Sequence, residues 1–121
     1  MGYLYIFITI LLTIYGQIVL KWRMNQMPNI PTETIAKFRF LFFSIFDPYI
    51  FSSFVAAFLA SLTWMAALRE FEISKAYPMM ALSFVGVSVI SHYLFLESMN
   101  WMKVIGTILV VLGVIVISKG S

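Results

Sequence analysis

The chain alternates between long apolar stretches and short polar connections. Four stretches contain no charged side chain, and they cover residues 2–20, 48–68, 76–96 and 104–118. The first three are 19, 21 and 21 residues long and the fourth is 15, whereas a helix needs roughly 20 apolar residues to cross a bilayer. The pattern predicts an all-α membrane protein of one domain, residues 1–121. Its four transmembrane helices are expected over residues 2–21, 48–69, 75–96 and 101–118.

The first connection is long and has an apolar pattern of its own. It runs from Lys21 to Asp47, which is 27 residues. Its apolar side chains recur at intervals of three and four residues, at Ile35, Phe38, Phe42 and Phe46. We expect residues 32–46 to form an amphipathic helix in the membrane interface, between the first two transmembrane helices. The alternative is an extension of the second helix, but Asp47-Pro48 favours a break, since the residue before proline disfavours helical backbone.

Composition supports a membrane protein and excludes several kinds of chemistry. The chain is 62% hydrophobic and 11% charged, with a mean hydropathy of +0.98, whereas soluble domains are about 45–50% apolar and about 25% charged. It has no cysteine and one histidine, so disulfides, thiolate catalysis and a multi-histidine metal site within one chain are excluded. No nucleophile–base set stands out. We therefore expect no enzyme activity, no metal and no cofactor.

The charges suggest lipid contacts and an orientation. The net charge of +3 is spread between the apolar stretches rather than gathered in one patch, which fits anionic lipid headgroups better than nucleic acid. Five basic residues belong to the first and third connections: Lys21, Arg23, Lys37, Arg39 and Lys103. Three belong to the other side: Arg69, Lys75 and Lys119. The positive-inside rule favours the cytoplasm for the five-charge side, although so small a difference also permits insertion in both orientations.

Three stretches resemble a known transporter family. The first helix ends in Thr13-Ile14-Tyr15-Gly16-Gln17-Ile18-Val19-Leu20-Lys21, the third begins with Ala76-Tyr77-Pro78-Met79, and the fourth carries Gly106 and Gly113. Together they resemble the small multidrug resistance branch of the drug/metabolite transporter superfamily. The nearest group is the EamA-like small subunits of the aminoarabinose-phosphoundecaprenol flippase. The resemblance covers all four helices and leaves out the long first connection.

One departure separates the branches of this superfamily. Its drug-exporting members carry a membrane-embedded glutamate three residues before the glycine of the first helix, and alignment on Gly16 puts Thr13 there. A buried carboxylate can exchange a proton for a cation, whereas a threonine cannot. The flippase-like branch also lacks this glutamate. The resemblance therefore implies a flippase or flippase subunit that moves a polyprenyl-phosphate-linked sugar across the inner membrane, as a homodimer or a heterodimer with a related small subunit.

Two other functions stay open at the level of sequence. The first is a small-cation or drug/proton antiporter that uses a coupling residue such as His92 in place of the glutamate. The second is a non-transporting accessory subunit that positions a glycosyltransferase through the long first connection. Both remain multi-pass membrane proteins, so transport measurements rather than topology separate them from the flippase.

Lys21 and Gln17 are the candidate substrate-binding residues of the first helix. Uncompensated charge in hydrocarbon is very costly, and Lys21 could neutralise the phosphate, although it could also anchor the helix end at the interface. Gln17 lies one turn earlier on the same side of the helix and could bind the sugar. An amide inside an apolar span needs a partner, so the alternative for Gln17 is a hydrogen bond between helices.

The third helix and the connection before it supply further candidates. Tyr77 is a candidate substrate contact and Glu72 a candidate partner for the amine of an amino sugar. The alternatives are an aromatic residue of the membrane interface and a solvated carboxylate. His92 is a candidate proton relay, unless it is neutral and hydrogen-bonded to a neighbour such as Ser88 or Ser91.

Gly106 and Gly113 lie seven residues apart, which places them two turns apart on one face of the fourth helix. Small residues let membrane helices approach closely. The resemblance implies that this face forms the dimer contact.

Overall fold

Every regular element of the described chain is a helix. The computed structural model describes residues 2–120, and no strand occurs among them. The six helices are α1 (Gly2–Gln26), α2 (Thr34–Ser44), α3 (Pro48–Glu70), α4 (Ile73–Met79), α5 (Ala81–Leu94) and α6 (Trp101–Lys119). Four segments are long and apolar enough to cross a membrane: α1, α3, α4 together with α5, and α6. The prediction of an all-α membrane protein with four transmembrane helices is confirmed.

The first helix continues beyond the apolar stretch that predicted it. The expected end was residue 21, whereas α1 ends at Gln26. In this additional part, Arg23 Nη1 donates a hydrogen bond to Gln26 Oε1 across 2.9 Å. An apolar stretch marks the residues that lie in hydrocarbon, and a helix does not have to end where the hydrocarbon ends. The first connection is therefore helical at its start, and outside α2 it is irregular over residues 27–33 and 45–47.

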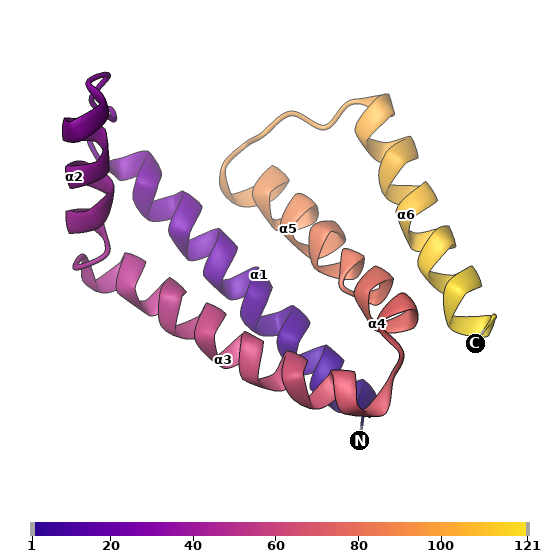
Figure 1. The fold of residues 1–121 in the computed structure, drawn as a ribbon. Coiled ribbons are helices and arrows are strands. Elements are labelled where there is room, and N and C mark those ends of the chain that lie inside the picture. Colours follow the sequence, from indigo (N-terminus) through magenta and orange to yellow (C-terminus); the bar gives the residue numbers. More distant parts are fainter. Residues whose placement is uncertain (1, 121) are drawn as a thin grey trace.

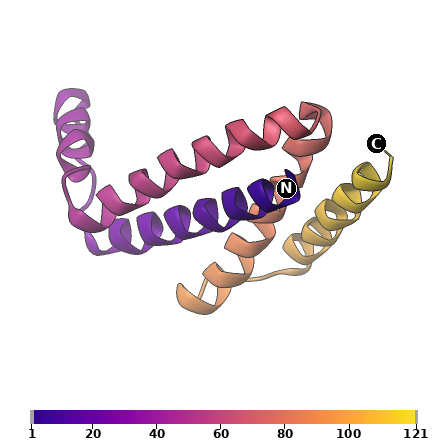
Figure 2. The ribbon, with the colours of Figure 1, turned by 90° about the horizontal axis from the view of Figure 1, so that it is seen from below.

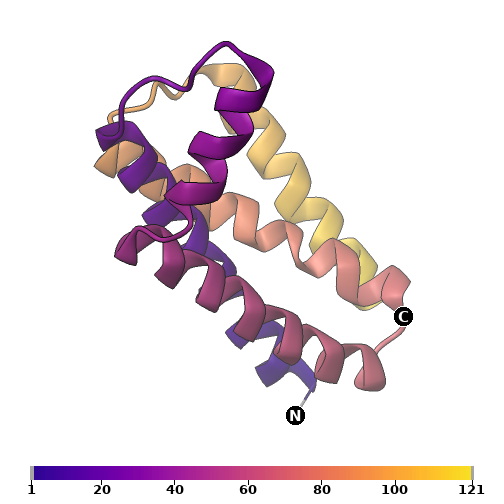
Figure 3. The same ribbon diagram turned by 60° about the vertical axis from the view of Figure 1, so that its left-hand side comes forward.

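The amphipathic segment is a separate helix. α2 covers Thr34–Ser44, somewhat less than the expected residues 32–46. It is separated from α3 by Asp47, whose carboxylate accepts hydrogen bonds from the backbone N–H groups of Tyr49 and Ile50 and so caps α3. α2 stands across the end of the α1–α3 pair at which α1 ends and α3 begins (Figures 1 and 3).

α1 and α3 run antiparallel side by side and form the most closely packed part of the molecule (Figure 2). Small residues line their contact, where Gly16, Ala56 and Ala60 are buried. A Cβ atom on Gly16 would lie 3.2 Å from the carbonyl oxygen of Ser53, so the two backbones approach closely there. Membrane helices gain little from burying apolar surface against each other, so such close approach and polar links hold them together.

The third span is bent between its two helices. Pro78 lies inside α4 and has no N–H to donate, which interrupts the regular hydrogen-bond pattern. Met80 follows α4 and donates its backbone N–H to the carbonyl groups of Ala76 and Tyr77. The span expected over residues 75–96 is therefore two successive helices, and the second ends at Leu94.

α6 lies at the edge of the molecule, beside α4 and α5 and away from α3 (Figures 1 and 2). Val114 is its buried residue. No atom of the described chain outside the helix lies within 4 Å of the position that a Cβ would take on Gly106 or Gly113. One chain therefore leaves the glycine-bearing side of α6 uncovered.

Candidate functional site

A groove with a partly polar lining runs between α1 and α3. It encloses about 210 Å³ and is lined by Leu12, Thr13, Gly16, Gln17, Leu20, Ser53, Phe54, Ala57 and Ala60. The groove exists because small side chains from both helices face each other beside Gly16, which leaves space that larger residues would fill. Gln17, a sequence-predicted substrate residue, therefore lies in a groove of the structure.

The amide of Gln17 is available to a ligand. Gln17 is exposed, and its side chain makes no hydrogen bond to any residue from 2 to 120. Thr13, one turn earlier, makes none either within the same range. The polar links between α1 and α3 lie elsewhere, for example at the 2.6 Å hydrogen bond between the hydroxyl groups of Thr9 and Thr63. An amide in an apolar span needs a partner, and this one finds none among residues 2–120.

A second, almost wholly apolar pocket continues the groove toward α2. It encloses about 570 Å³ and is lined by Leu20, Met24, Phe38, Leu41, Phe42, Ser44, Ile45, Ile50 and Phe54. Leu20 and Phe54 line both pockets, so the two pockets are adjacent. Phe38 and Phe42 of α2 line the second pocket, and the amphipathic helix thus forms one wall of it.

Lys21 lies beside the junction of the two pockets at Leu20, but it lines neither pocket. It follows Leu20 directly, is exposed, and lies one turn beyond Gln17. Among residues 2–120 it has no ion-pair partner. Gln17 and Lys21 therefore lie on the same side of α1, one turn apart, and of the two only Gln17 lines the groove.

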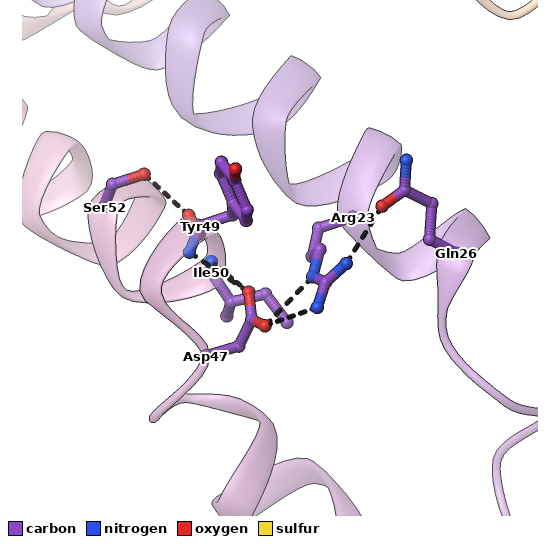
Figure 4. A network of polar contacts seen from close by, with 6 residues as sticks. All are labelled: Arg23, Gln26, Asp47, Tyr49, Ile50 and Ser52. Atoms are coloured by element: carbon purple, nitrogen blue, oxygen red, sulfur yellow. Dashed lines mark hydrogen bonds and ion pairs between the residues drawn. The ribbon is translucent and has the colours of Figure 1, made fainter.

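Sequence reasoning missed a polar cluster beside this junction. Arg23 Nε and Nη2 lie 2.9 and 2.8 Å from Asp47 Oδ1, and the guanidinium carbon lies 5.5 Å from the centre of the Tyr49 ring (Figure 4). Trp22 packs edge-on against the same ring, with ring centres 5.0 Å apart. The hydrogen bond from Arg23, followed by those from the backbone of α3, lowers the pKa of the Asp47 carboxyl below its ordinary value of 3.8.

This cluster fastens the end of α1 to the start of α3. Asp47 caps α3 while it pairs with α1, so one carboxylate fixes both helices at the end where α2 crosses them. An aspartate before Pro48 is a recognisable cap signal in the sequence. Its pairing with Arg23, 24 positions away, carries no such signal.

Tyr77 and Glu72 lie at the opposite end of the molecule from Lys21. The start of α1 meets the α3–α4 connection, where the Tyr3 and Phe71 rings are 4.9 Å apart. From Tyr3 to Lys21 the helix rises about 27 Å. Tyr77 is 68% exposed and packs edge-on against Trp64 at a distance of 6.3 Å between ring centres. One chain does not bring the four predicted substrate residues into one pocket.

His92 belongs to neither pocket described above. Its Nδ1 atom lies 2.8 Å from the backbone carbonyl oxygen of Glu97. The sequence suggested Ser88 or Ser91 as its hydrogen-bond partner, and that suggestion was wrong. The difference arises because the connection after α5 folds back and brings a carbonyl group to the ring.

The fold and the groove define a class of protein. The chain is a multi-pass membrane protein in which no acidic side chain lies in the interior of a span: its five acidic residues are at helix ends or in connections, namely Glu33, Asp47, Glu70, Glu72 and Glu97. The chain belongs to the EamA-like transporter family, whose model matches residues 1–119. The resemblance seen in the sequence is thereby confirmed.

Curated relatives cover almost the whole chain. A protein of Proteus mirabilis named "Probable 4-amino-4-deoxy-L-arabinose-phosphoundecaprenol flippase subunit ArnF" is 32% identical over 98% of this chain and 92% of its own length. An ArnF subunit of the same name from Erwinia tasmaniensis is 30% identical, over 97% of this chain and 94% of the relative. An ArnE subunit from Pseudomonas fluorescens is 28% identical, over 89% of each. No solved structure matches the chain.

Proposed function

We propose that this protein is a small flippase subunit that moves a polyprenyl-phosphate-linked sugar across the inner membrane. The observation that carries the proposal is the near full-length similarity to proteins named as subunits of a flippase for an amino-sugar phosphoundecaprenol. Its partner is a related small subunit or a second copy of the chain. The substrate is the lipid itself, and the work is to carry a phosphate and a sugar through hydrocarbon.

The two adjacent pockets beside α1 suit such a substrate. Burying an unpaired phosphate or sugar hydroxyl in hydrocarbon is costly, whereas a polyprenyl chain is apolar and can remain in hydrocarbon. Gln17 offers donors and an acceptor for the sugar, and Lys21 offers a cation for the phosphate one turn away. The apolar pocket between α2 and the α1–α3 pair gives the first units of the tail a place to lie.

The remaining predicted residues act elsewhere in this proposal. Glu72 and Tyr77 lie at the far membrane side and meet the sugar there, with the Glu72 carboxylate facing the amine. The uncovered side of α6, with Gly106 and Gly113, receives the second subunit. His92 stays a predicted proton relay.

The absence of an acidic residue from the interior of α1 disfavours an antiporter that couples through the glutamate position of the drug exporters, and it leaves His92 as the coupling residue of the antiporter alternative. α1 has Thr13 at the position where the drug exporters hold their glutamate, and no acidic side chain occurs between Gly2 and Gln26. Proton exchange through that position therefore has no group to carry it. The other alternative, a non-transporting subunit that positions a glycosyltransferase, gives no function to the groove between α1 and α3.

The proposal is tested by measuring which leaflet holds the glycolipid. Cells lacking the gene are labelled with an amine reagent that cannot cross the membrane, and total glycolipid is measured in parallel. We expect surface labelling to fall at least about tenfold while the total is maintained. The native chain and the matched control Lys119→Gln restore labelling, whereas Lys21→Gln and Gln17→Leu do not. Unchanged labelling in cells without the gene would contradict the proposal.

A further inference from the structure

A third pocket, separate from the groove, lies between the end of α5 and the start of α6. It encloses about 280 Å³ and is lined by Phe84, Val87, Ser88, Ser91, His92, Glu97, Ser98, Met99, Lys103 and Thr107. Unlike the pocket beside α2, it contains a cation, a carboxylate, an imidazole and several hydroxyl groups. The α5–α6 connection, which supplies Glu97, Ser98 and Met99 to the pocket, lies at the same end of the molecule as α2 (Figure 3).

The connection between α5 and α6 is held in place over this pocket. His92 Nδ1 donates to the carbonyl oxygen of Glu97, and Lys103 Nζ donates to the carbonyl oxygen of Ser98 across 2.9 Å. Asn100 caps α6 by accepting a hydrogen bond from the Lys103 backbone. Leu96 has a φ of 54°, in the left-handed region that residues with a side chain rarely adopt. These contacts hold the polar groups of the connection in fixed positions.

The two charges of this pocket are not paired with each other. Among residues 2–120 the one ion pair is that of Arg23 with Asp47, so Glu97 and Lys103 line the same space without forming a salt bridge. Lys103 keeps two N–H donors beyond the one given to Ser98. His92 Nε2 makes no hydrogen bond within the described chain. The pocket thus presents separate positive and negative positions.

Aromatic side chains place the pocket at the level of lipid headgroups. Tyr93 and Trp101 flank it in sequence, and they are 74% and 81% exposed. Exposed tyrosine and tryptophan at the ends of spans are typical of the boundary between hydrocarbon and headgroups. A pocket at this depth is accessible to the polar end of a lipid whose chains remain in the bilayer.

We propose that this pocket binds a lipid headgroup that carries both a phosphate and a primary ammonium group. Lys103 and the hydroxyl groups of Ser88 and Ser91 hold the phosphate, and the Glu97 carboxylate with His92 Nε2 holds the ammonium. An ammonium donates to a carboxylate and to a neutral ring nitrogen, so each group has a complementary partner. Two lipids have this chemistry: the amino-sugar phosphoprenol of the proposed function, on which this part of the inference rests, and the phosphatidylethanolamine of the bilayer.

Lipid binding to the purified full-length protein in detergent, followed by native mass spectrometry, tests the inference. The probes are phosphatidylethanolamine, phosphatidylglycerol, the amino-sugar phosphoundecaprenol and undecaprenyl phosphate. We expect Lys103→Gln to weaken binding of at least one ammonium-bearing lipid about tenfold, since a charged hydrogen bond is lost, and Lys103→Arg to preserve it. Glu97→Gln should weaken the ammonium-bearing lipids and leave phosphatidylglycerol and undecaprenyl phosphate unchanged. Lys37→Gln and Glu33→Gln, on the same membrane side, are matched controls.

The pattern of losses separates the two sources of the headgroup. A Glu97 dependence restricted to the amino-sugar lipid assigns the pocket to the substrate, and one restricted to phosphatidylethanolamine assigns it to the bilayer. A dependence of both supports a shared site. Equal losses for lipids with and without ammonium in Glu97→Gln, or a Lys103→Gln variant that behaves like Lys37→Gln, would overturn the inference. The two proposals can fail separately. If deletion of the gene leaves glycolipid labelling unchanged, the flippase proposal fails. If phosphatidylethanolamine binding still depends on Glu97 in that case, the proposal that the pocket binds a lipid headgroup is retained.

Discussion

The α1–α3 pair and the α5–α6 pair are built in different ways. α1 and α3 approach closely at Gly16, share the hydrogen bond between Thr9 and Thr63, and are fastened at one end by Asp47. α6 lies beside α5 with Val114 as its buried residue, and the neighbourhood of its glycines is open. All four spans are apolar enough to cross a membrane, and α5 and α6 are no less apolar than α1 and α3, so hydrophobicity does not explain the difference.

The contrast shows which helix contacts one chain satisfies by itself and which helix surface it leaves exposed. In hydrocarbon, small residues and polar links hold helices together, and the α1–α3 pair has both. The α1–α3 pair is therefore held together within one chain, and the groove with Gln17 lies between its two helices. The α5–α6 pair has few such contacts within one chain, which leaves its surface for a second subunit or for lipid.

The largest difference between the two pairs should come from filling their glycine positions. Gly16→Leu places a side chain where a Cβ already lies 3.2 Å from a backbone oxygen, and such overpacking costs about 1–3 kcal/mol. We expect the Tm in detergent to fall by roughly 10 °C and transport to be lost. Gly113→Leu meets no neighbour within 4 Å in the described chain and should change the Tm of the monomer by less than about 2 °C. Equal destabilisation by both would remove the contrast.

A smaller effect is expected from the charge that fastens α1 to α3. Asparagine still caps a helix, so Asp47→Asn removes the ion pair with Arg23 and keeps the cap. Because the pKa of Asp47 is lowered in the folded protein, its contribution to stability is complete above the ordinary value of 3.8 and is lost as the pH falls through the lowered pKa. We expect the variant to melt a few degrees below the native chain at pH 7.

The pH dependence provides the check on this second prediction. Thermal unfolding of both proteins is followed from pH 7 down to pH 2, and the gap between them should close only below about pH 4. Glu33→Gln, at a carboxylate without an ion pair or capping bond, should follow the native chain throughout. The absence of a gap at pH 7 would show that Asp47 acts through its cap rather than its charge, and a gap that persists at the lowest pH would contradict the ion pair as its cause.

The smallest effect is expected from the hydrogen bond within the α1–α3 pair. Thr63→Val removes the partner of Thr9, whose hydroxyl still donates to the carbonyl oxygen of Tyr5 at 2.7 Å. Hydrogen bonds between membrane helices are worth about 0.6 kcal/mol on average, so the loss should be close to that value. In α6, Thr107 bonds only to the carbonyl group of Lys103 in its own helix, and Thr107→Val is the control. Unfolding in denaturing detergent measures both, and an equal loss would contradict the assigned link.

The fold could be predicted from the sequence wherever bilayer thickness dictates it. The lengths of the uncharged stretches follow directly from the hydrocarbon they must cross, and an aspartate before Pro48 marks the start of α3. The extension of α1 to Gln26 and the bend at Met80 follow from local hydrogen bonds instead. Hydropathy does not report such bonds.

The candidate site was predictable only in part for the same reason. Gln17 and Lys21 stand out because polar groups are rare in an apolar span, and of the two the structure places Gln17 in the groove. The apolar pocket depends on how a 27-residue connection folds back against α1 and α3. No local sequence pattern predicts that arrangement. The headgroup pocket depends on a backbone carbonyl, that of Glu97, which bonds His92. Side-chain patterns do not reveal a partner of that kind.

The most direct test is transfer of the lipid-linked amino sugar between the leaflets of vesicles that hold the purified protein with its partner subunit. The account predicts that the lipid reaches the opposite leaflet, that Gln17→Leu slows the transfer at least about tenfold, and that Lys119→Gln does not. Vesicles that leave the lipid in its original leaflet while exchanging protons for aromatic cations would contradict it.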